Sequence, residues 1–84
     1  MSYYANKIHS LLGCSLDDAA MIEDIMRNDV LHTVALDWLS EQEFNAAVRK
    51  ASRLLEQNRA DYEAYYAGTR AIFKQMQAAQ AKRA

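Results

Sequence analysis

One short stretch, residues 39–44, carries two helix-start signals that agree with each other. Ser40 and Glu43 form a capping box: the serine hydroxyl can accept a hydrogen bond from the Glu43 N–H, and the Glu43 carboxylate can accept one from the Ser40 N–H. Leu39 and Phe44 flank this cap as a hydrophobic staple. A helix is therefore predicted over 41–57. Its apolar face recurs at steps of three and four: Phe44, Ala47, Val48, Ala51, Leu54 and Leu55.

Turn-forming residues are scarce in the rest of the chain. The 84 residues include no proline and only two glycines, Gly13 and Gly68, which favours helix over a sheet and its tight turns. We therefore predict an all-α fold, a small bundle of about four helices in the single domain 1–84. The one cysteine, Cys14, cannot form an intramolecular disulfide. No apolar stretch reaches the ~18 residues that span a bilayer, so we expect a cytoplasmic protein without membrane contact.

Further signals place the other helices. A helix is predicted over 2–12, ended by Gly13, and another over 16–28, with Ser15 as its N-cap. Residues 29–39 are apolar and partly β-branched, and Val30, Leu31, Val34 and Trp38 would also share one helix face. Because no second strand is available to pair with, we expect a connector or short helix that lays Trp38 on the core.

The last helix raises a question of continuity. The apolar spacing of 41–57 continues without a phase change to about residue 78. A single helix over 41–78 would be ~57 Å long and would imply a dimer. We favour a break at 58–60, a separate helix over 60–78, and a frayed tail over 79–84.

Charge is divided unevenly along the chain. Residues 15–43 carry eight acidic side chains and one basic side chain, a net charge of −7, whereas 49–84 carry eight basic and three acidic, a net charge of +5. One interpretation is self-complementarity, within one chain or across a homodimer. The other is an acidic face that docks on the basic surface of a protein partner by electrostatic steering. The residues of this predicted partner-binding face are Asp17, Asp18, Glu23, Asp24, Asp29 and Glu41.

Catalytic and metal-binding patterns are lacking. His9, His32 and Cys14 show none of the spacings of a metal site, apart from the weak pair Asp29 and His32. Cys14 has no base placed near it in the sequence, and there is no glycine-rich phosphate loop. We expect a protein that is not an enzyme and that uses no cofactor and no metal.

Nucleic-acid binding is the alternative function. A basic patch formed by Arg49, Lys50, Arg53 and Arg59 could contact phosphates, and the tyrosines could stack on bases. However, the helix that would read DNA opens with acidic residues, which would repel the phosphate backbone. Nucleic acid is therefore the less favoured partner.

Aromatic residues are numerous for so small a helical chain. Tyr62, Tyr65, Tyr66 and Phe73 cover more than one narrow helix face, so one or more should be exposed. Aromatic side chains with polar tips are favoured at interfaces. We expect this aromatic interface to join two copies in a homodimer, and a purely structural homodimer is a further alternative for the function.

The stretch Leu11–Ala51 resembles small all-helical accessory proteins of phages and mobile elements. Its residues Leu12–Asp18 lead into Ile22–Arg27 and then Leu36–Ser40. Some proteins of that kind are anti-CRISPR inhibitors, which cover the nucleic-acid-binding or docking surfaces of effector complexes. The resemblance lies in size, helicity and an acidic helical surface, and it carries over no individual functional residue. It implies an inhibitor whose acidic face docks on a basic, nucleic-acid-handling protein.

Overall fold

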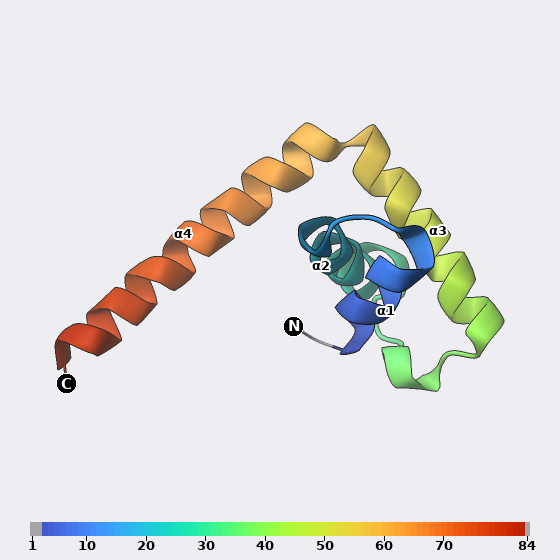
Figure 1. Ribbon diagram of the computed structural model, residues 1–84, viewed down its shortest axis with the longest axis horizontal. Helices are drawn as coiled ribbons and strands as arrows, with labels where there is room; N and C mark the ends of the chain where they lie inside the picture. The colour runs from blue at the N-terminus through green and yellow to red at the C-terminus, as the bar shows by residue number, and fades with distance from the viewer. Residues whose placement is uncertain (1–2, 84) are drawn as a thin grey trace.

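The computed structural model shows four α-helices and two short helical turns (Figure 1). It describes residues 3–83, and beyond Gly68 it describes the side chains of Ile72, Gln75, Met76, Ala78 and Ala79 only. Residues 3–83 contain no strand, so the predicted all-α fold is confirmed. In chain order the elements are α1 (Tyr3–Leu12), α2 (Leu16–Ile25), the π-helical turn η1 (Met26–Val30), the 3₁₀ turn η2 (Leu36–Trp38), α3 (Glu41–Gln57) and α4 (Arg59–Arg83).

The helix starts form as the sequence predicts. The Glu43 N–H donates to Ser40 Oγ at 3.2 Å, and the Ser40 N–H donates to Glu43 Oε1 at 3.0 Å, which completes the capping box of α3. Ser15 caps α2 by accepting from the Asp18 N–H at 3.1 Å. Gly13 ends α1 at φ 68°, a left-handed conformation that glycine adopts without a Cβ penalty.

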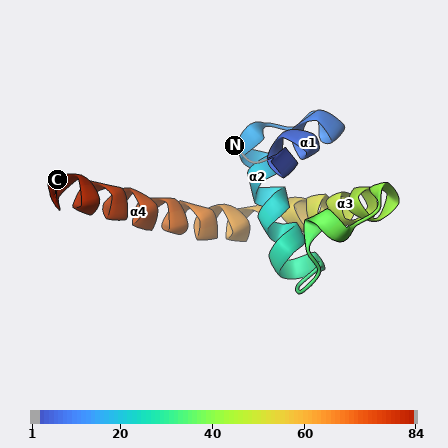
Figure 2. The same ribbon diagram turned by 90° about the horizontal axis from the view of Figure 1, so that it is seen from below.

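One hydrophobic core lies among α1, α2 and α3. Figure 2 shows α2 beside both other helices. Ile8, Ile22, Ile25, Met26 and Val48 are its largest fully buried side chains. The apolar face predicted for α3 supplies half of the remainder, because Phe44, Ala47, Ala51 and Leu55 are also buried. The core therefore fixes the positions of α2 and α3. These are the helices that position the start of α4, because α4 follows α3 in the chain and bonds to side chains of α2 and η1.

The connector between α2 and α3 differs from the prediction. The helix that begins at Leu16 continues past residue 28 as η1, and only residues 31–39 form the connection, which includes η2. Trp38 does not lie on the core: 83% of its surface is exposed, whereas Leu36, two residues earlier, is 3% exposed. The reason is the tight turn of η2, in which side chains two positions apart point in different directions, so only one of the two can face the core.

The predicted break after α3 is present. Asn58 leaves the helical conformation at φ −128° and ψ 32°, and its side-chain amide donates to the Leu54 carbonyl at 3.2 Å. A single helix over 41–78 is therefore excluded. α4 then turns away from α1–α3 and projects as a long arm (Figures 1 and 2). Its backbone is helical to Arg83, five residues past the predicted end, and the frayed tail over 79–84 stays a prediction.

None of the helices within the described part of the chain is long and apolar enough to cross a membrane.

Candidate functional site

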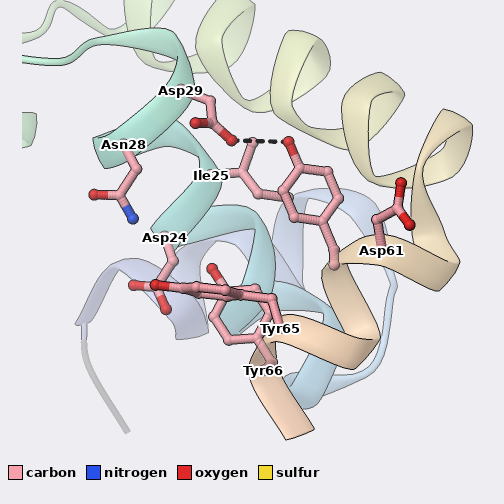
Figure 3. Close-up of a pocket in the computed structure, with 8 residues that line it drawn as sticks. Asp24, Ile25, Asn28, Asp29, Asp61, Tyr65 and Tyr66 are labelled. Atoms are coloured by element: carbon pink, nitrogen blue, oxygen red, sulfur yellow. Dashed lines mark hydrogen bonds between the residues drawn. The ribbon is translucent and has the colours of Figure 1, made fainter. Parts of the chain in front are cut away.

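A groove of about 460 Å³ runs between α2–η1 and the first two turns of α4 (Figure 3). Its lining combines carboxylates with phenol rings and includes no basic residue among the described side chains. The lining residues are Asp24, Ile25, Asn28, Asp29, Asp61, Tyr62, Tyr65 and Tyr66. We call this feature the acidic tyrosine groove.

The π-helical turn shapes one wall of the groove. The Leu31 N–H bonds to the Met26 carbonyl, five positions earlier, at 2.8 Å. In a regular α-helix, residues five apart point about 140° away from each other. The wider turn carries Asp29 back toward the side of the helix that bears Asp24, so both carboxylates line the same groove.

Tyrosine hydroxyls from α4 form the opposite wall. The Tyr62 hydroxyl donates to Asp29 Oδ2 at 2.8 Å, the bond drawn dashed in Figure 3. Tyr66 bonds to the Asp24 carboxylate, and its ring meets that of Tyr65 edge-on at a centroid distance of 5.3 Å. These two tyrosine–aspartate bonds hold the start of α4 against α2–η1.

Burial and neighbouring charges raise the pKa values of three side chains that line the groove. Burial, together with repulsion from neighbouring Glu23, raises the pKa of Asp24, although the Tyr66 hydroxyl and Arg27 oppose this shift. The hydrogen bond to Asp29, followed by burial, raises the pKa of Tyr62. Burial and the nearby Asp24 carboxylate raise the pKa of Tyr66 far above its usual range. Both tyrosines therefore remain protonated hydrogen-bond donors. The charged form of Asp24 is disfavoured, because its carboxylate is partly removed from water.

The predicted acidic face is distributed over several places. Asp24 and Asp29 lie in the groove. Asp17 and Asp18 lie on the other flank of α4, in a second, smaller hollow with Glu63. Glu41 is at the start of α3, 3.4 Å from Lys7 Nζ.

Several of these acids have partners within the chain. Arg59 meets Asp18 with two bonds, Nη1 to Oδ1 at 3.2 Å and Nη2 to Oδ2 at 3.1 Å. Glu23 pairs with Arg27 at 3.3 Å on the same helix. Arg27 belongs to the acidic segment itself, so the Arg59–Asp18 pair is the one of these two that joins the acidic segment to the basic segment, as the self-complementary interpretation expects.

The predicted basic patch is divided as well. Arg49, Lys50 and Arg53 are exposed on α3. Arg59 differs from these three residues because its guanidinium group is paired with Asp18 and with Glu63 of its own helix.

The predicted aromatic interface is placed in part. Tyr62, Tyr65 and Tyr66 all line the groove, and Tyr65 is 64% exposed. The side chain of Phe73 lies outside the described residues. Sequence reasoning missed Asn28 and Asp61 as lining residues. The position of Asp61 directly before Tyr62 could have indicated that Asp61 lines the groove. No clear sequence signal predicts the turn η1, which brings Asn28 to the groove.

The positions of Cys14 and His9 in the fold do not favour a reactive thiol. Burial raises the pKa of the Cys14 thiol, which disfavours the reactive thiolate. His9 Nδ1 contacts the Cys14 backbone carbonyl, not its sulfur. The described residues include no group of three or more side chains that could hold a metal ion.

Comparison of the chain with protein-family models, curated proteins and solved structures finds no match.

Proposed function

We propose that this chain is a non-enzymatic protein-binding module, in which the acidic tyrosine groove accepts a basic segment of a nucleic-acid-handling partner. The observation that carries the proposal is the lining itself, in which three carboxylates, Asp24, Asp29 and Asp61, occur together with three tyrosine rings. Carboxylates attract a lysine or arginine by charge, and aromatic faces stabilise the same cation by cation–π contact. Occupation of the partner's basic surface would exclude nucleic acid from it, as expected of an anti-CRISPR-like inhibitor.

The electrostatics support an encounter role for this surface. Preplaced charge mainly raises the association rate and the discrimination between partners, and it does so more strongly at low salt. Asp24 and Asp29 are held in place by Tyr66 and Tyr62, so these carboxylates need little ordering when a partner arrives.

The test is capture from host lysate at rising salt, with bound proteins identified by mass spectrometry. We expect a basic nucleic-acid-handling protein whose capture is lost in the triple variant Asp24→Asn, Asp29→Asn, Asp61→Asn. The control is Asp37→Asn, which removes one carboxylate from an exposed position in η2, outside the groove. Unchanged capture by the triple variant would refute the proposal.

A direct nucleic-acid binder would give a different result. Nucleic acid would be retained without a protein, and retention would depend on the exposed basic residues Arg49, Lys50 and Arg53 instead of the groove carboxylates.

We also propose that the chain forms a homodimer through α4. This is supported by large apolar side chains left open to solvent on the arm: Tyr65 is 64% exposed, Ile72 60% and Met76 55%. Large exposed apolar side chains that line up on one helix face indicate an interaction surface.

A further inference from the structure

The exposed apolar residues of α4 follow a coiled-coil repeat. Tyr65, Ile72 and Met76 fall into a series with alternating steps of three and four, the a and d positions of a heptad. The apolar part of the series along α4 is Tyr62, Tyr65, Thr69, Ile72, Met76 and Ala79, and the next position, Arg83, is charged and ends the stripe. This stripe begins inside the acidic tyrosine groove and continues along the arm, where α1–α3 no longer cover the helix (Figure 1).

We propose that the occupant of this stripe is α4 of a second copy, running antiparallel, so that its basic end lies in the acidic tyrosine groove. The proposal rests on the proposed function in one respect, because both give the groove a cationic occupant. It goes further by naming the segment, the last two turns of α4, and the orientation of the pair.

The antiparallel register is set by the apolar stripe. When a positions of one helix meet d positions of the other, Tyr65 faces Met76, Thr69 faces Ile72 and Tyr62 faces Ala79 of the second copy. A two-fold axis between residues 70 and 71 then repeats each contact. The large tyrosines at one end are thereby matched with methionine and alanine at the other, which alternates large and small side chains as packing requires.

Charge selects the same orientation. The flanking g positions, Asp61 and Lys82, become neighbours across an antiparallel pair, with two such pairs by symmetry. Asp61 lies in the first turn of α4 and lines the groove. Arg59, the cation at the start of the helix, is paired with Asp18 and Glu63, whereas the other four cations belong to its later part: Arg70, Lys74, Lys82 and Arg83. A parallel pair would instead leave Asp61 and Lys82 at opposite ends of the paired helices, without this attraction.

The arrangement has a consequence for the partner-binding proposal. The end of the second α4 would cover the acidic tyrosine groove, so self-association and binding of a basic partner exclude each other. Apparent affinity for the partner should then fall as the concentration of this protein rises.

Sedimentation equilibrium of the purified full chain, with no partner present, tests the inference. We expect a reversible dimer whose dissociation constant rises with salt. Ile72→Glu should yield a monomer, because it places a charge within the stripe. Ala78→Glu is the matched control: it adds the same residue at an exposed position outside the stripe and should leave the dimer intact. Circular dichroism checks that both variants remain helical, as expected because glutamate has a high helix propensity.

Charge reversal tests the orientation. Asp61→Lys and Lys82→Asp should each raise the dissociation constant about tenfold, since two attractive pairs become repulsive, and the double variant should restore it. In a parallel pair these two residues lie about 31 Å apart along the helix, and the double variant would restore nothing.

Three results would overturn the inference: a monomer at every concentration, a dimer that survives Ile72→Glu, or charge reversal without rescue. None of them bears on the lysate experiment, which depends on a foreign partner, so the two proposals can fail separately.

Discussion

The hydroxyl of Tyr62, in the first turn of α4, donates a hydrogen bond of 2.8 Å to Asp29 Oδ2 in the turn η1. The two residues are 33 positions apart, so this bond links the arm to the wall of the core. Together with the Tyr66–Asp24 bond and the Arg59–Asp18 ion pair, it sets the direction in which α4 leaves the body. The geometry of the groove thus depends on a few polar contacts at the start of one helix.

Tyr62→Phe should lower the free energy of unfolding by about 1 kcal/mol, the usual net worth of one hydrogen bond. Backbone amides in the first turns of α4 should also exchange faster, because the arm loses a link to η1. Chemical denaturation and hydrogen exchange measure the two effects. Tyr3→Phe, at a tyrosine that is 70% exposed on α1, is the control and should change neither. Equal exchange rates in wild type and Tyr62→Phe would show that the bond does not hold the arm.

Stability should fall at alkaline pH because of the same tyrosines. The pKa values of Tyr62 and Tyr66 are raised above 10.0 in the folded state, so the unfolded chain loses these protons first. The unfolded state then binds fewer protons than the native state, and the free energy of unfolding declines as the pH rises beyond that value. Below it the contribution of both groups is fully present. The double variant Tyr62→Phe, Tyr66→Phe should show a shallower alkaline decline in denaturation experiments, and an unchanged decline would contradict the assignment.

Replacement of Leu36 by alanine should lower the free energy of unfolding more than replacement of Trp38, although tryptophan is the larger side chain. Leu36→Ala should cost about 2–5 kcal/mol, since the side chain is 3% exposed and its removal leaves a cavity. Trp38→Ala should change the free energy of unfolding by less than about 0.5 kcal/mol, because 83% of its surface is already in water. Thermal or chemical denaturation of the two variants gives the comparison. A larger loss for Trp38→Ala would mean that the indole packs on the core after all.

The contrast between these two residues shows where sequence reasoning reaches its limit. Ser15, Ser40 and Gly13 act through neighbours in the chain, so their caps and stop signals were predictable and are confirmed. The α3 core face follows from helical spacing, and the break at Asn58 was the favoured alternative. Within 31–39 the helical spacing of Leu31, Val34 and Trp38 favours Trp38 as the core residue, but tertiary packing buries Leu36 instead.

The candidate site depends on the same kind of long-range information. The number and spacing of the tyrosines of α4 predict an interface, which stays a prediction, and the structure places Tyr62, Tyr65 and Tyr66 in the groove. Their alignment with Asp24 and Asp29 required both the break at Asn58 and the π-helical turn, and a π-turn has no reliable sequence signature. For this reason the acidic residues were predicted as one face, whereas the structure separates Glu41 and Asp18 from the groove.

Asp24→Asn tests whether the groove carries a carboxylate at the expense of stability. Burial is the main cause of the raised pKa of Asp24, so its charged form is disfavoured in the folded protein. The uncharged amide that replaces the carboxylate in this variant can still accept the Tyr66 bond. We therefore expect the variant to be slightly more stable than wild type at pH 7 while losing affinity for a basic partner.

The pH dependence of that difference gives a sharper test. Because the folded pKa is raised, the native state holds this proton more tightly than the unfolded chain, whose value is near 3.8. Wild type therefore loses stability relative to the variant as the pH rises from about that value through the folded pKa, and the difference is constant above it. Denaturation at a series of pH values should show the two proteins converging in acid. A variant that is less stable than wild type at pH 7 would mean that the bond between ionised Asp24 and Tyr66 outweighs the cost of burial. The carboxylate would then be a structural support of α4, and its presence in the groove would no longer favour partner binding.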